Sequence, residues 1–113
     1  MAQPVRGEIW RAKLPKGMGH EQEGVRPAVI IVDVGQSDII MALPLTGEPD
    51  AERFKYTFEV VPNDRNNLGK ESIALVFQMR ALSKERLVEK VGELDAKDLA
   101  HINLILKDML KLA

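Results

Sequence analysis

The first two-thirds of the chain consists of short segments in which apolar residues either alternate with polar ones or follow one another, as in β-strands. Residues 8–14 alternate and stop at Pro15-Lys16-Gly17, which is a turn sequence. Residues 25–32 and 38–45 are apolar and rich in β-branched side chains, which is typical of strands buried on both faces. Gly35-Gln36-Ser37 separates these two runs and predicts that they form a hairpin.

Three further segments extend the predicted sheet. Residues 54–61 alternate strictly and predict a strand whose aromatic side covers the interior of a barrel. Residues 72–77 have the composition of another buried strand, and residues 86–94 alternate as expected of an edge strand. Residues 62–69, rich in Asn, Asp and Gly, predict a turn between the strands at residues 54–61 and 72–77.

The period of the hydrophobic pattern changes at Asp95. Apolar residues then recur at spacings of three and four, at Leu99, Ile102, Leu106, Met109 and Leu110. Asp95 is suited to cap a helix that runs for about 17 residues, and Asp98 favours its first turn. The whole pattern predicts a mainly β (α+β) fold: a small closed or half-closed β barrel with one C-terminal α-helix.

Length and composition restrict the number of domains and the class of protein. The 113 residues, 45% of them apolar, suffice for one modest core and therefore for a single domain over residues 1–113. No apolar stretch approaches the roughly 20 residues of a membrane-spanning helix, so no membrane association is expected. The absence of cysteine excludes a disulfide framework and a thiolate metal site. Residues 1–7 lack the apolar core of a secretory signal, so a cytoplasmic location is expected.

The charges are unevenly distributed along a chain whose formal net charge is only −1. Residues 1–30 carry five basic and three acidic side chains, whereas residues 31–64 carry two basic and seven acidic ones. This asymmetry permits a local phosphate site but provides no overall basic field of the kind that strong duplex binders use.

Established catalytic motifs are absent. The chain has no nucleotide-binding loop, no pair of histidines at helical spacing and no nucleophile elbow, so neither a metal nor a cofactor is expected. His101 lies among the apolar residues of the predicted helix, where a structural or solvent-facing role is expected.

The polar segment at residues 16–24 is the densest candidate site. It contains three glycines, is long for a hairpin turn and leads directly into a core strand. Arg26 stands at the base of this loop, where it either forms a surface ion pair or serves a site. Thr46 ends a buried strand before Gly47, where its hydroxyl is either a turn cap or a site group.

Several short motifs occur in a characteristic order: Arg6-Gly7-Glu8-Ile9-Trp10, Gly19-His20-Glu21-Gln22 with Gly24 and Arg26-Pro27-Ala28, Thr46 after a buried strand, and Gln78-Met79-Arg80 followed by Arg86-Leu87. In this order and spacing the chain resembles the MazF/PemK family of type II toxin endoribonucleases. The resemblance implies an SH3-like barrel of the MazF/PemK/CcdB type that forms a homodimer. It also implies cleavage of single-stranded RNA at a short sequence, without a metal, and inhibition by a cognate antitoxin whose disordered acidic segment lies in the RNA groove.

The resemblance also implies roles for individual residues. Arg26 and Thr46 match the family's catalytic pair, and an arginine fork suits the nonbridging oxygens of a phosphate. Arginine is a poor base, so Glu21 is the candidate that accepts the 2′-hydroxyl proton. The expected RNA-binding residues are Lys16, His20, Gln22, Gln78 and Arg80.

The chain departs from the family pattern at two positions. Phe77 stands where many relatives carry an acidic residue, and Ala81 stands where relatives tend to have threonine. These departures leave open a non-catalytic RNA- or protein-binding module on the same fold. A poison of DNA gyrase is the other alternative, although residues 107–113 lack the terminal aromatic expected of one. Trp10, the only tryptophan, is expected in the core or a dimer interface rather than stacked on a base.

Overall fold

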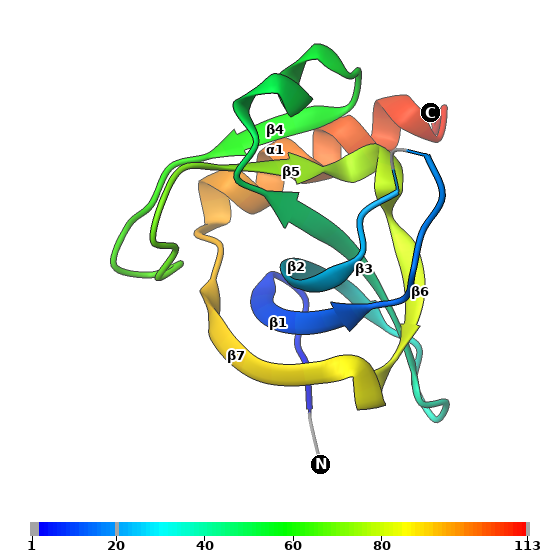
Figure 1. Cartoon of the computed structure of the whole chain (residues 1–113). Coiled ribbons are helices and arrows are strands. Elements are labelled where there is room, and N and C mark those ends of the chain that lie inside the picture. The colour runs from blue at the N-terminus through cyan, green and yellow to red at the C-terminus, as the bar shows by residue number, and fades with distance from the viewer. Residues whose placement is uncertain (1–2, 20, 113) are drawn as a thin grey trace.

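The structure is a computed structural model that describes residues 3–19 and 21–112. Seven antiparallel strands form one strongly curled sheet in the order β4-β5-β3-β2-β1-β7, with β6 paired to β3 (Figure 1). The strands are β1 (Glu8–Leu14), β2 (Gly24–Asp33), β3 (Ile39–Thr46), β4 (Thr57–Val60), β5 (Ser72–Leu75), β6 (Arg80–Ser83) and β7 (Leu87–Glu93). A single helix, α1 (Ala96–Met109), follows the last strand.

Strand β3 organises the sheet because it pairs with three neighbours. One edge pairs with β2, while the other pairs with β6 over residues 39–42 and with β5 at Leu45 and Thr46. Since two different strands share one edge of β3, the sheet divides there and curls around the core. The predicted hairpin and the half-closed barrel with a helix are therefore confirmed.

Helix α1 closes the core beside β4 (Figure 1). Asp95 caps it as predicted, because its Oδ1 accepts a hydrogen bond from the backbone N–H of Asp98 (2.8 Å). Burial, followed by the neighbouring Asp95 carboxylate, raises the pKa of Asp98. Ile102 and Leu106 enter the core, whereas Leu110 is half exposed. The helix has 14 residues and is thus shorter than predicted.

Three predicted strands have different limits in the structure. β4 begins at Thr57, because Tyr56 adopts a positive φ of 67° that ends the extended conformation. β5 ends at Leu75 and continues into the 3₁₀ turn η2 (Val76–Gln78), and the short strand β6 that follows was not predicted. β2 is buried on both faces only over residues 28–31.

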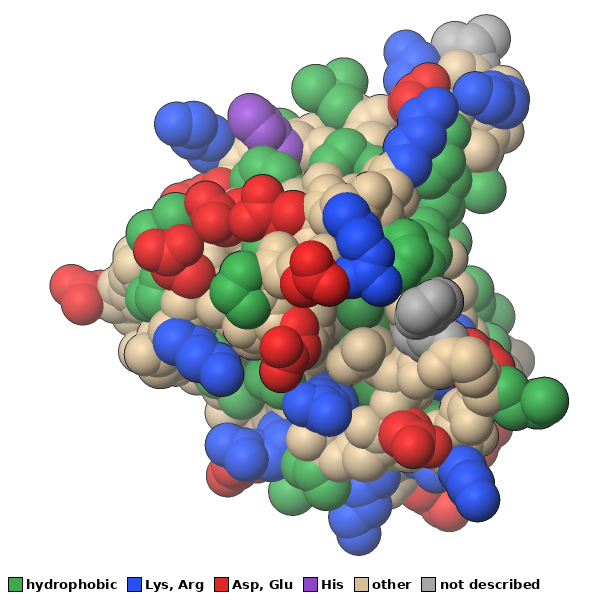
Figure 2. Space-filling view, turned by 45° about the horizontal axis from the view of Figure 1, so that its top comes forward, with side chains coloured by type: hydrophobic (Ala, Val, Ile, Leu, Met, Phe, Trp, Pro, Cys, Tyr) green, Lys and Arg blue, Asp and Glu red, His purple; other side chains and the backbone are tan. Residues whose placement is uncertain are grey.

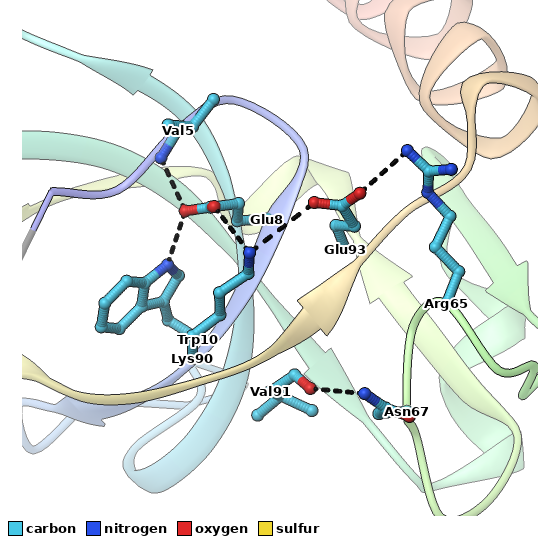
Figure 3. A network of polar contacts seen from close by, with 8 residues as sticks. All are labelled: Val5, Glu8, Trp10, Arg65, Asn67, Lys90, Val91 and Glu93. Atoms are coloured by element: carbon cyan, nitrogen blue, oxygen red, sulfur yellow. Dashed lines mark hydrogen bonds and ion pairs between the residues drawn. The ribbon is translucent and has the colours of Figure 1, made fainter.

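Figure 3 shows how β1, β7 and the loop of residues 61–71 are tied together. The Glu8 carboxylate accepts hydrogen bonds from the Val5 N–H and from Trp10 Nε1, and it pairs with Lys90 (3.0 Å). Burial raises the pKa of Glu8, but these three partners outweigh burial and leave the pKa lowered. The hydrogen bond to Glu8 in turn raises the pKa of Lys90. Trp10, partly buried and bonded to Glu8, therefore has a structural role within the chain.

The described part of the chain contains no helix that is long and apolar enough to cross a membrane.

Candidate active site

Arg26 and Thr46 lie at the same end of the β2–β3 strand pair. The ladder between these strands ends at the pair Ala28–Pro44; beyond it β2 extends to Gly24 and β3 extends to Thr46. Arg26 lies two residues before Ala28 and Thr46 two residues after Pro44, so in this antiparallel pair both residues lie beyond the same end of the ladder. The two residues that are far apart in the sequence are thus brought to one end of the sheet.

The two side chains differ in their surroundings. Arg26 is exposed, its Nε donates a hydrogen bond to the Glu23 carbonyl (3.2 Å), and it forms no ion pair within residues 3–19 and 21–112. Thr46 is only 3% exposed, and its hydroxyl accepts a hydrogen bond from the Glu48 N–H (3.2 Å). The hydroxyl therefore caps the turn after β3 and at the same time lines a pocket.

The loop before β2 is held by its own acidic side chains. Glu23 accepts a hydrogen bond from the Gly17 N–H (2.8 Å), and Glu21 accepts one from the Met18 N–H (2.9 Å). Lys16 is exposed and lines neither of the pockets described below. His20 lies outside the described residues.

Side chains from η2 and β6 fix the backbone of Gln22. The Gln22 N–H donates to Gln78 Oε1 (2.9 Å), and Arg80 donates to the Gln22 carbonyl oxygen (3.2 Å). Gln78 comes from η2 and Arg80 from the start of β6, so the two elements missed in the sequence pattern position the loop. Three of the predicted RNA-binding residues are thereby brought together.

Two pockets open on either side of Gln78. The first has a volume of about 220 Å³ and is lined by Gln22, Thr46, Glu48, Asp50, Ala51, Arg53, Phe54, Leu75 and Gln78. The second, of about 360 Å³, is lined by Glu21, Phe77, Gln78, Met79, Arg80 and Ala81. Glu21 and Thr46 thus face different pockets that share one glutamine, and Arg26 lines neither.

The sequence pattern missed the contribution of the turn η1 (Pro49–Arg53) and of Phe54 to the first pocket. Phe54 does not cover the barrel interior as predicted; its ring lies 5.3 Å from that of Phe77. Arg53 pairs with Asp50 and places its guanidinium carbon 4.4 Å from the centre of the Phe54 ring. Proline at the start of a turn followed by Asp50 is a helix-start signal that was available in the sequence.

Charged side chains of both signs are interspersed on the face of the molecule in Figure 2. A strongly basic surface of the kind that binds duplexes is not seen on this face. In residues 3–19 and 21–112 no three His, Asp or Glu side chains are grouped so that they could hold a metal ion.

Comparison with known proteins identifies the class to which this fold and site belong. Residues 5–110 match the model of the PemK-like, MazF-like toxins of type II toxin-antitoxin systems, and the chain belongs to this family. The family resemblance seen in the sequence motifs is thereby confirmed.

Individual relatives support this assignment. The chain is 34% identical over 101 residues to the endoribonuclease MazF of Staphylococcus saprophyticus, covering 87% of this chain and 83% of that protein. It is also similar to the crystal structure of MazF from Deinococcus radiodurans, with 25% identity, a TM-score of 0.79, and coverage of 96% of this chain and 97% of that one. A mycobacterial endoribonuclease in complex with its cognate antitoxin has the same fold, with 21% identity, a TM-score of 0.72 and coverage of 98% of each chain.

Proposed function

We propose that this chain is the toxin of a type II toxin-antitoxin system and cleaves single-stranded RNA at a short sequence without a metal ion, so that translation and growth are inhibited. The observation that carries the proposal is the position of Arg26 and Thr46 at one end of the β2–β3 pair, in a chain of the MazF/PemK family. The 34% identical relative is itself named an endoribonuclease.

The reaction follows from the chemistry of the ribose. The 2′-oxygen attacks the adjacent phosphorus, the bond from phosphorus to the 5′-oxygen breaks, and the products are a 2′,3′-cyclic phosphate and a 5′-hydroxyl. Arg26 stabilises the negative charge on the nonbridging oxygens and donates a proton to the departing 5′-oxygen, while the Thr46 hydroxyl positions the phosphate. The exposed guanidinium, with only Nε bonded to the Glu23 carbonyl, suits this role.

Glu21 accepts the proton of the 2′-hydroxyl in this proposal. One of its carboxylate oxygens is bound by the Met18 N–H, which fixes the side chain and leaves the second oxygen for the proton. Because Glu21 and Thr46 line different pockets, the RNA backbone has to pass over Gln78, the residue that the pockets share.

The RNA is held by polar side chains on both sides of this path. Gln22, Gln78 and Arg80 offer amide and guanidinium groups to unpaired bases, and Lys16 and His20 contact the RNA from the loop. Phe77 adds an apolar wall to the second pocket in place of an acidic group.

The partner proposed for the inactive state is an antitoxin. Structures similar to this chain include MazE-MazF of Deinococcus radiodurans (24% identity, TM-score 0.73, coverage of 97% of each chain). We propose that a disordered acidic segment of a cognate antitoxin places carboxylates near Arg26, Lys16 and Arg80 and so occupies the place of the RNA phosphates.

The test is incubation of the purified protein with an end-labelled RNA in excess EDTA. Discrete fragments with cyclic-phosphate ends are expected, and their yield should fall as salt screens the phosphate contacts. Loss of cleavage in EDTA contradicts the metal-independent mechanism. Intact RNA together with inhibited DNA supercoiling would favour a gyrase poison instead.

A further inference from the structure

The pocket beside Thr46 has the size and the lining of a site for one nucleobase. Its volume of about 220 Å³ is smaller than the roughly 300 to 1,000 Å³ of pockets that hold drug-sized ligands. Leu75, Ala51 and Phe54 supply an apolar floor and wall, and carboxylates of Glu48 and Asp50 lie at its rim. Carboxylate oxygens at the rim can accept hydrogen bonds from the N–H groups of a base.

Glu48 is held in place through its backbone. Its N–H donates to the Thr46 hydroxyl (3.2 Å), and its carbonyl oxygen accepts a hydrogen bond from the Ala51 N–H (3.0 Å). The Glu48 carboxylate itself is exposed and forms no ion pair with any described residue. Asp50, by contrast, is neutralised by Arg53. Glu48 is therefore the carboxylate that remains to accept hydrogen bonds from a ligand, and its N–H is hydrogen-bonded to Thr46, the threonine proposed to position the phosphate.

Two further features of the pocket suit a flat, polar ring. Arg53 lies over the Phe54 ring, which gives the wall the aromatic and guanidinium surface on which bases stack. Gln22 Oε1 is buried without a hydrogen-bond partner among the described residues, and Gln22 lines the same pocket. A buried acceptor without a donor is costly, and a donor on a bound base would satisfy it.

We propose, resting on the proposed function, that this pocket takes one base next to the scissile phosphate and that Glu48 determines which base is accepted. The carboxylate accepts hydrogen bonds from the Watson–Crick edge of the base. Guanine fits best because its N1–H and its amino group are adjacent donors. Uracil fits worst because its single N–H is flanked by two carbonyl oxygens, whose lone pairs face the carboxylate.

The test uses short RNAs that differ only in the bases flanking a single cleavage site. For the wild type, kcat/KM should be higher with guanine than with uracil at one flanking position. Glu48→Gln replaces one acceptor oxygen by a donor of the same shape and should lower this ratio roughly ten-fold or more, as expected for a bidentate base contact. Glu52→Gln is the matched control, since Glu52 lies in the same turn, is exposed and does not line the pocket.

A second arm separates this inference from the cleavage mechanism. Dissociation constants are measured for the same oligonucleotides made uncleavable by a 2′-deoxyribose at the cleavage site. If the wild type fails to cleave yet binds guanine-containing oligonucleotides more tightly in a way that Glu48→Gln abolishes, the proposed function fails and the pocket assignment stands. An unchanged guanine-to-uracil ratio in Glu48→Gln, or no base preference in the wild type, overturns the assignment.

Discussion

Gln78 and Arg80 hold the loop before β2 from the neighbouring elements η2 and β6. Both were expected to contact RNA, and in the structure both bind the backbone of Gln22. The hydrogen bonds fix the loop that carries Glu21 between the two pockets. Positioning the loop and binding the substrate are compatible, because an amide and a guanidinium group have several hydrogen-bonding sites.

Gln78→Ala should loosen the loop before it affects the chemistry. The loss of one hydrogen bond, a net effect of about 0.5–1.5 kcal/mol, predicts that the amide of Gln22 exchanges roughly two- to ten-fold faster. KM should rise more than kcat falls. Hydrogen exchange followed by mass spectrometry or NMR measures the exchange rate of the Gln22 amide. Gln78→Glu keeps the acceptor oxygen and should therefore exchange at this amide as slowly as the wild type. Unchanged exchange at Gln22 in Gln78→Ala would contradict this positioning role.

Glu8 gives the protein a stability that depends on pH. Burial raises its pKa, but the hydrogen bonds from Trp10, Lys90 and the Val5 N–H leave it below that of an unfolded glutamate, about 4.3. The contribution of Glu8 is therefore present above that pH and is lost as the pH falls through the lowered value of the folded state.

The free energy of unfolding in urea, measured from pH 7 down to about 3, tests this. The wild type should have a larger free energy of unfolding than Glu8→Gln at neutral pH, and this difference should shrink as the pH falls. Glu71→Gln, at an exposed position, should follow the wild type throughout. A difference that stays constant with pH would show that Glu8 is not stabilised in its charged form.

At the scale of elements, the loop of residues 61–71 is docked on β7 through a close backbone approach. Asn66 is fully buried, and its side chain bonds the backbone of Val61, Asn63 and Leu68. Gly92 in β7 permits this approach, because a Cβ there would lie 2.5 Å from the Asn66 carbonyl oxygen. The backbone atoms it would meet cannot rotate away as a side chain does.

Gly92→Ala is therefore expected to destabilise the fold by about 1–3 kcal/mol, the usual range for overpacking a core. Gly69→Ala is the matched control, because a Cβ at Gly69 meets nothing within 4 Å, and its effect should stay within about 0.5 kcal/mol. Urea denaturation measures both variants. Equal stability of the two variants would mean that the loop does not depend on Gly92.

The sequence predicts elements well where the local pattern alone decides them. β1, the β2–β3 hairpin and the helix cap at Asp95 are of this kind. The start of β4 depends on the positive φ of Tyr56, and β6 exists through its pairing with β3. Such features come from tertiary contacts, and so does the pocket beside Thr46. The turn η1 is different, because its proline and Asp50 are a local start signal that the strand-based interpretation passed over.

At the scale of the whole molecule, three strands, β4, β6 and β7, have only one neighbouring strand each in the described pairing. Unpaired strand edges are commonly covered by another chain. The helix adds exposed apolar side chains, with Leu104 at 66% and Leu110 at 50% exposure. Small barrels of this kind gain stability from a two-fold interface, and we propose that the protein is a homodimer with RNA bound along that interface.

Sedimentation equilibrium at micromolar concentration should therefore give a mass near twice the 12.6 kDa of the chain. Leu104→Ser tests whether the exposed side of α1 belongs to the dimer interface. If it does, the substitution should raise the dissociation constant of the dimer. A clean monomer over the whole concentration range would contradict the homodimer.

The most direct test of the central claim is the single-turnover rate of RNA cleavage in EDTA for the wild type, Arg26→Ala and Thr46→Ala. Each substitution should lower the rate by about 10² or more, the usual effect of losing a transition-state contact, while the protein stays folded. Arg11→Ala, which removes an exposed arginine paired with Glu89 in the same sheet, should cleave like the wild type. Cleavage by Arg26→Ala or Thr46→Ala at the wild-type rate would contradict the assignment of that residue to the reaction.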